Sequence, residues 1–210
     1  MDTKLLNDPL YLAAISFSKF INKNFIYTLD NGAMIEVMFK RCNFAHLIGL
    51  HKLIDIELLR KLSDKRYHVS DLVYKQILKG KLTYEQISTS AFFDDMEDRL
   101  INFKSIDELL FSEIIINFDK SKVRKSDLKS TVILFEKKGT NYLHLCIAKD
   151  SKTNSHYPET FLVQADKYYI NGQDKVLVRS VRMIDSKSKD TERLFLSVNG
   201  KFVEQAVVLT

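Results

Sequence analysis

Apolar positions recur at helical spacing in the first half of the chain and at strand spacing in the second half. A helix is predicted from Pro9 to about residue 23, because Asp8 suits the N-cap and Pro9 suits the first helical position. Further helices are predicted between about residues 42 and 111. Gly80 ends one of them, and Thr83 opens another with a capping box.

Strand-like runs flank Asn31-Gly32, which predicts a hairpin with positive φ at both central residues. After Ser112 the pattern predicts six strands separated by turn-forming residues: "EIIINF", "TVILFEKK", "YLHLCIAK", "ETFLVQA", "KVLVRSVRMI" and "RLFLSV". Helices before strands predict the α+β class with an antiparallel sheet, the helical part at about 1–111 and the sheet at about 112–198. The length suits a single domain, 1–210.

Composition favours an anionic partner and gives no sign of a membrane. The net charge is +5 and the isoelectric point is about 9.0, which suits RNA or DNA. Cys42 and Cys146 are far apart and form no CxxC pair, which favours a reducing cytoplasm. No apolar run approaches the roughly 20 residues that span a bilayer. The N-terminal residues lack the basic-then-apolar order of a signal peptide, and none is expected.

No strong catalytic motif is present: the sequence has no Walker loop, GxSxG, HExxH or GxGxxG pattern. Histidines occur at positions 46, 51, 68, 144 and 156, without the spacing of metal ligands. We therefore expect no metal site and no cofactor.

Polar side chains interrupt several of the predicted strands. Tyr142 and His144 share the mixed face of their strand, which suits either solvent or the floor of a cleft. Arg179 and Arg182 each interrupt an apolar row, so each reaches either an anion or water at a sheet edge. His156, Tyr157 and Thr160 cluster where the strand of "SHYPETF" begins, a position that suits either a functional site or a surface loop.

The stretch "NFAHLIGLHKL" places two histidines in an apolar run. Periodicity alone favours a structural, hydrogen-bonded role for His46, because it lies on a partly apolar helical face. His51 stands beside Lys52 in a more polar context, which predicts an exposed side chain.

Two short elements together resemble the phage-associated branch of the barnase–EndoU–colicin–RelE superfamily of ribonucleases. They are "HLIG" within "FAHLIGLHKL", after the hairpin, and "YPETF" in the strand-rich half. In that branch a His-Leu-x-Gly element lies on the helical part, and an element like Pro-x-Ser/Thr-Phe lies on a strand. The resemblance runs from about Phe25 to Arg182. It implies a mainly helical N-terminal half packed on a curled antiparallel sheet formed by the C-terminal half.

The resemblance also implies metal-independent cleavage of RNA, with the ribose 2′-hydroxyl attacking its own phosphate. A base takes the hydroxyl proton, an acid protonates the leaving oxygen, and cations stabilise the charge on phosphorus. His46 is carried over from the His-Leu-x-Gly element as base or acid. His156 is added from the strand pattern as a second proton carrier, and Arg179 or Arg182 stabilises charge.

Substrate binding is assigned to Thr160 from the "YPETF" match, with Tyr142, His144 and Arg182 as further candidates. The expected protein is an endoribonuclease that acts on RNA in the cytoplasm, as a toxin or as a phage or mobile-element effector. An antitoxin or immunity protein would be its inhibitor. The helical segment 54–111 exceeds what a minimal nuclease of this kind needs, which suits binding a partner or holding the site closed. The alternative is a non-catalytic nucleic-acid- or protein-binding module on the same fold, an inhibitor or a defence-system component.

Overall fold

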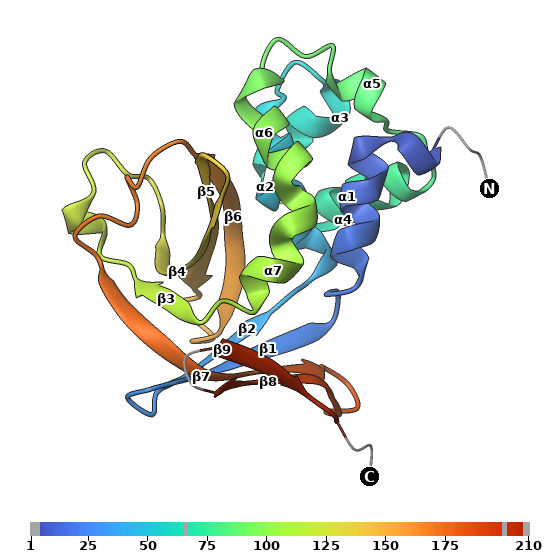
Figure 1. Cartoon of the computed structure of the whole chain (residues 1–210). Coiled ribbons are helices and arrows are strands. Elements are labelled where there is room, and N and C mark those ends of the chain that lie inside the picture. Colours follow the sequence, from blue (N-terminus) through green and yellow to red (C-terminus); the bar gives the residue numbers. More distant parts are fainter. Residues whose placement is uncertain (1–4, 65–66, 199–200, 208–210) are drawn as a thin grey trace. The chain divides into compact units, whose positions relative to one another are not determined.

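The computed structural model describes residues 5–64, 67–198 and 201–207, and its contacts group the chain into two compact units. The first, called the helical unit, comprises Met1–Ile21 and Lys40–Ser105. The second, called the strand unit, comprises Asn22–Phe39 and Ile106–Thr210. Figure 1 draws both with their elements labelled. The single domain expected over 1–210 stays a prediction.

The helical unit consists of short helices joined by tight turns. Its α-helices are α1 (Pro9–Ser18), α2 (Phe44–Leu47), α3 (Glu57–Arg60), α4 (Tyr67–Leu78), α5 (Tyr84–Ile87) and α6 (Asp94–Asn102). Its 3-10 helices are η1 (Leu5–Asn7), η2 (Arg41–Asn43), η3 (Leu50–Lys52), η4 (Lys61–Asp64) and η5 (Phe103–Ser105). Of the helices in the described ranges, none combines the length and apolar character needed to cross a bilayer.

Local end signals explain where several of these helices begin and end. Asp8 accepts hydrogen bonds from the backbone N–H groups of Leu10 and Tyr11, which confirms the predicted N-cap of α1. The Thr83–Gln86 capping box is confirmed at α5. Gly80 follows α4 with a φ of +65°, the left-handed conformation expected where a helix ends.

An aromatic core holds the shortest helices of this unit in place. Phe44 of α2 contacts Phe17, Tyr74 and Phe103, with ring centroids 5.4, 5.2 and 5.7 Å away, respectively. All four rings are buried. A four-residue helix cannot persist alone in water, so α2 depends on this packing. The same packing fixes the backbone that carries His46.

The strand unit contains nine strands and one α-helix within the described residues. They are β1 (Lys23–Leu29), β2 (Met34–Met38), α7 (Ile106–Leu110), β3 (Ile114–Asn117), β4 (Ser130–Lys138), β5 (Asn141–Lys149), β6 (His156–Gln164), β7 (Asp174–Asp185), β8 (Thr191–Val198) and β9 (Lys201–Gln205), with the 3-10 helix η6 (Lys120–Lys122). The predicted strands after Ser112 are all present. Helices and strands are both present, in agreement with the α+β class.

Seven strands close into a ring in the order β1-β2-β6-β5-β4-β3-β7, because β7 pairs with β1 as well as with β3. The ring is a closed barrel, so the curled sheet implied by the resemblance is wrong. The sheet is also not formed by the C-terminal half alone, since β1 and β2 belong to it. Nor is it wholly antiparallel, because β2 and β6 pair in parallel. Strands β8 and β9 extend it beyond β7.

The hairpin between β1 and β2 is present, but its turn differs from the predicted one. Gly32 has a φ of +82°, and Asn31 does not have a positive φ. The Leu29 N–H donates to the Ala33 carbonyl, and the Gly32 N–H donates to the Leu29 carbonyl. The turn is therefore longer than a two-residue turn, and it needs positive φ only at glycine.

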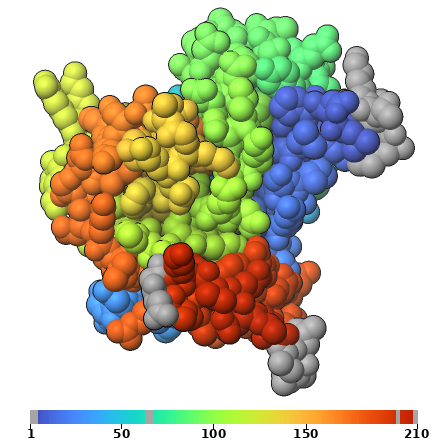
Figure 2. Space-filling model, in the orientation of Figure 1, coloured from blue at the N-terminus to red at the C-terminus, as the bar shows by residue number. Residues whose placement is uncertain are grey.

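The lysine-rich connection between β3 and β4 projects from the surface of the strand unit, where Figure 2 shows it in yellow-green. Its basic side chains are exposed: Lys120, Lys122, Arg124, Lys125 and Lys129. Lys122 forms an ion pair with Asp174 at 3.4 Å. Exposed pairs of this kind contribute little to stability.

Candidate functional site

The residues expected at the site lie in both units. His46 belongs to α2 of the helical unit. The other six lie on strands of the strand unit: Tyr142 and His144 on β5, His156 and Thr160 on β6, and Arg179 and Arg182 on β7. Each unit therefore presents its own cluster.

In the helical unit, His46 packs against His51. The two ring centroids are 4.9 Å apart and the ring planes are inclined by 37°. His46 ends up beside His51 because Gly49 has a φ of +85°, which reverses the chain between α2 and η3. A side chain at this position would be strained by the backbone and also crowded. An added Cβ would lie 3.1 Å from Met96 Cβ and 3.6 Å from Arg99 Cδ.

Two positive side chains, Arg99 and Lys52, lie close to this histidine pair. The Arg99 Nη1 atom would lie 3.6 Å from a Cβ at Gly49, so the guanidinium lies against the turn. Burial, together with the nearby His46, Arg99 and Lys52, lowers the pKa of His51 to about 4. Burial likewise lowers the pKa of Lys52, with Arg99 adding to the effect. His51 is therefore neutral near pH 7, and the positive groups Arg99 and Lys52 act on it, while Asp95 lies close to Lys52.

The predicted exposure of His51 is wrong. Its side chain is partly buried, and its Nδ1 atom is buried without a hydrogen-bond partner among the described residues. The prediction considered only the adjacent Lys52, whereas the turn at Gly49 directs the imidazole back toward His46.

In the strand unit, one end of the ring opens into a pocket of about 430 Å³, called here the ring mouth. Every one of the seven ring strands contributes to its lining, and most of the lining residues lie near the ends of their strands. The lining residues are Leu29, Asn31, Ala33, Met34, Ile35, Ile115, Asn117, Thr131, Val132, Lys149, His156 and Val176.

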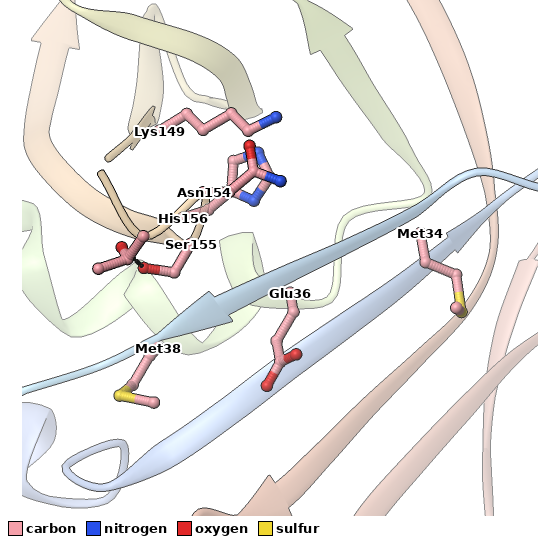
Figure 3. Close-up of a pocket in the computed structure, with 8 residues that line it drawn as sticks. Met34, Glu36, Met38, Lys149, Asn154, Ser155 and His156 are labelled. Carbon is pink, nitrogen blue, oxygen red and sulfur yellow. Dashed lines mark hydrogen bonds between the residues drawn. The ribbon is translucent and has the colours of Figure 1, made fainter. Parts of the chain in front are cut away.

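Lys149 and His156 are cross-strand partners on β5 and β6, and both line the ring mouth. They also line an adjoining pocket of about 410 Å³ together with Met34 and Glu36. Figure 3 shows the Lys149 and His156 side chains near each other, while the Glu36 carboxylate points away from them. Glu36 instead accepts a hydrogen bond from Asn24. Burial lowers the pKa of His156, the charge of Lys149 lowers it further, and the Glu36 backbone opposes both effects.

His156 lies where the ring closes. Its Cα partner on β2 is Val37, and this is the one paired position of the β2–β6 seam among the described residues. The seam is therefore short, and the residue that forms it on β6 lines both pockets.

Three predicted substrate-binding residues lie on the other face of the strands. Thr160 pairs with Cys146, whose side chain belongs to a buried cluster covered by the loops after β3 and β6. Tyr142 packs against the same cluster. His144 is fully buried, and its ring lies 5.9 Å from that of Tyr169 in an edge-to-face arrangement. None of the three lines either pocket described above.

Burial lowers the pKa of His144 to about 4, although the nearby Tyr142 and Leu162 backbone groups oppose this. Neither ring nitrogen makes a hydrogen bond of good geometry within the described residues. His144 is therefore neutral near pH 7 and contributes to the packing of the buried cluster.

The two arginines of β7 are exposed. Arg182 alternates with the buried residues Val181 and Met183, so it points to the opposite face of the strand. Arg179 lies at a break in register between β1 and β7, where Leu29 pairs with Val178 and Thr28 pairs with Ser180. Neither arginine lines the ring mouth. Charge stabilisation by either of them stays a prediction.

A family model described as phage-Barnase-EndoU-ColicinE5/D-RelE like nuclease4 matches residues 10–196. The chain belongs to this nuclease family. The match includes the histidine pair and the ring mouth, and it confirms the resemblance inferred from the two short elements. Membership indicates nuclease function and a nucleic acid as the substrate. No curated protein and no solved structure matches the chain.

Sequence reasoning about this nuclease missed three residues of its clusters. His51 could have been found from its spacing, because a glycine between two histidines of an apolar run permits the reversal that brings them together. Arg99 reaches the pair from α6, and nothing in the sequence pattern of α6 sets it apart. Lys149 joins His156 through the register of β5 and β6, which the strand pattern alone did not specify.

Proposed function

We propose that this nuclease is an endoribonuclease that cleaves RNA without a metal ion, through attack of the ribose 2′-hydroxyl on the adjacent phosphate. The observation that carries the proposal is the His46–His51 pair, which lies within the stretch that first suggested the family. Arg99 of α6 lies against the turn that joins the two histidines. Proton transfer and stabilisation of negative charge are what this reaction needs. Histidine and arginine side chains can supply both.

In the proposed reaction His46 carries the proton. Two imidazoles 4.9 Å apart in positive surroundings do not both charge readily, and His51, with its pKa near 4, stays neutral. We therefore assign the proton transfer to His46. His51 acts as a positioning residue that holds the His46 ring. Arg99 and Lys52 stabilise the charge that develops on the phosphate.

The strand pattern also suggested His156 as a proton carrier, and we propose this role for it within the strand unit. His156 lines both pockets of the strand unit, which supports a role in contact with substrate. Single replacements distinguish its role from that of His51. A proton carrier changes the pH dependence of kcat, and a residue that only binds substrate changes KM.

We further propose that the enzyme acts on cellular RNA in the cytoplasm, as a toxin or as a phage or mobile-element effector, and that a protein inhibitor restrains it in its own host. The support is the family description, which names phage nucleases. Induced expression in a bacterial host tests the proposal. Growth should slow with the intact chain and recover with His46→Ala at equal protein levels. Growth unaffected by the intact chain would argue against the toxin role.

The products test the chemistry directly. Purified protein in excess EDTA should cut a short labelled RNA and leave 2′,3′-cyclic phosphate ends. The same oligonucleotide with one 2′-deoxy residue should resist cleavage at that residue, because the attacking hydroxyl is missing. Cleavage that requires added Mg²⁺, or that proceeds past the 2′-deoxy residue, would contradict the mechanism. Binding of RNA with no cleavage under any condition would favour the non-catalytic binding module.

A further inference from the structure

We propose that the ring mouth of the strand unit binds one nucleoside monophosphate unit of a nucleic acid. The first argument is its construction. All seven strands of the closed ring line a single pocket of about 430 Å³. Pockets for small organic ligands span roughly 300 to 1,000 Å³, and a single nucleotide falls at the lower end of that range.

The second argument is the distribution of charge. Lys149 and His156 line the ring mouth, and none of its lining residues is acidic. Lys149 has no carboxylate partner in the part of the chain that the structure describes, so its ammonium group is available. Glu36, the nearest acid on β2, points away and is occupied by Asn24. A phosphate group fits this pair of donors.

The third argument is the apolar wall. Leu29, Ile35, Ile115, Val132 and Val176 line the ring mouth with aliphatic side chains. An inorganic phosphate would leave this wall in contact with water. A nucleobase has apolar faces that can bury it, so the wall, Lys149 and His156 together fit a nucleotide better than they fit either part alone.

The fourth argument is unused hydrogen-bonding capacity at the rim. The side chains of Asn117 and Thr131 line the ring mouth and make no hydrogen bond within the described residues. Thr131 lies at a register shift between β4 and β5, where a bulge directs a side chain differently from its neighbours. An amide and a hydroxyl both donate and accept, as the edge of a base or a ribose requires.

The inference rests on the proposed function only in one respect: the proposed function identifies the nucleic acid that supplies the nucleotide as RNA. Its test is therefore binding rather than cleavage. Adenosine, uridine, cytidine and guanosine 5′-monophosphates, the free nucleosides and inorganic phosphate would each be titrated into the full chain, with amide chemical shifts as the readout. At least one monophosphate should bind about tenfold more tightly than its nucleoside and than inorganic phosphate.

Two variants and one control locate the binding site. Lys149→Gln should weaken monophosphate binding about tenfold, because one charge-assisted hydrogen bond is lost. Val176→Phe should abolish binding by filling the pocket. The control, Lys137→Gln, removes the same charge from an exposed position of β4 that does not line the ring mouth, and should leave binding unchanged. If Val176→Phe fails to fold, the two lysine variants decide the question.

Three results would overturn the inference. They are no binding at millimolar monophosphate, equal affinity for monophosphate and inorganic phosphate, and equal weakening by Lys149→Gln and Lys137→Gln. Nucleotide binding without RNA cleavage would support this inference while removing the proposed enzyme activity. Metal-independent RNA cleavage without nucleotide binding would do the reverse, so the two proposals fail separately.

Discussion

The helical unit and the strand unit each present positive and titratable side chains, and the two clusters are built in different ways. His46 and His51 are brought together by one glycine turn, and their positions follow from a few neighbouring residues. Lys149 and His156 meet across two strands, and the pocket around them exists because the ring closes. The difference indicates that the first cluster depends on one backbone conformation and the second on long-range strand register.

The largest effect on stability is expected at Gly49, whose backbone conformation holds the histidine pair together. Gly49→Ala should destabilise the protein by about 2 to 5 kcal/mol, because it combines a left-handed φ with crowding against Met96 and Arg99. Gly139→Ala is the matched control. It has a φ of +61° and nothing within 4 Å of an added Cβ, so it should cost about 1 kcal/mol.

Urea unfolding of both glycine variants measures the difference. A loss of RNA cleavage confined to Gly49→Ala, measured well below its melting temperature, would tie the turn to the histidine pair. Equal stability of the two variants would show that the crowding at Gly49 is relieved. The dependence of the histidine pair on this backbone conformation would then be wrong.

The next largest effect is on the pH dependence of stability. It concerns one histidine from each unit, His51 and His144, because both have a pKa near 4. Between about pH 6.5 and 4 the unfolded chain binds protons that these folded residues do not, so stability falls as the pH falls through that window. His144 is fully buried and contributes roughly 3 kcal/mol to this loss.

His144→Leu should therefore remove about 3 kcal/mol of the difference in unfolding free energy between pH 7.5 and pH 4. At pH 7.5 its stability should match or exceed that of the parent, since no hydrogen bond of good geometry is lost. The exposed His68 in the helical unit supplies the control, His68→Leu. An unchanged pH dependence in His144→Leu would show that His144 is charged or solvated in the fold.

A smaller effect is expected when the partner of His46 is removed. His51→Asn should lower kcat about ten- to hundredfold, because the His46 ring loses the contact that orients it. The pH optimum of cleavage should also move, since the imidazole next to His46 is gone. His68→Asn should change neither quantity. If His51→Asn kept the wild-type kcat and pH profile, His46 would act without help from His51, which would contradict the positioning role.

The smallest effect is expected when one buried tyrosine hydroxyl is removed from each unit. The Tyr74 hydroxyl donates to the Ala14 carbonyl at 2.8 Å, and the Tyr27 hydroxyl donates to the Leu110 carbonyl at 2.9 Å. Tyr74→Phe and Tyr27→Phe should each lower the free energy of unfolding by about 1 kcal/mol. Chemical denaturation measures both. An unchanged value for either variant would mean that its carbonyl finds another donor.

Features set by neighbouring residues were predictable from the sequence. The N-cap at Asp8, the capping box at Thr83 and the helix end at Gly80 all follow from contacts within a few positions. The strands after Ser112 were visible as apolar runs, and His46 was singled out by the short element that contains it. The α+β class followed from the order of these elements.

Features set by distant pairing were not predictable in the same way. Closure of the ring depends on β1 pairing with β7 and on the short parallel seam at Val37 and His156, and no local pattern encodes either. The strand pattern around His144 did not reveal the loops that bury this face of β5. Lys149 went unnoticed because a single exposed lysine gains meaning only from the pocket around it.

The central claim is that His46 carries the proton in metal-independent RNA cleavage. The most direct measurement is the single-turnover rate of cleavage of one defined RNA in excess EDTA, for the wild-type chain, His46→Ala and His68→Ala. The wild type and His68→Ala should cleave at the same rate, and His46→Ala should be slower by about 10² to 10⁴. Equal rates in all three proteins, or no cleavage until a divalent metal is added, would contradict the claim.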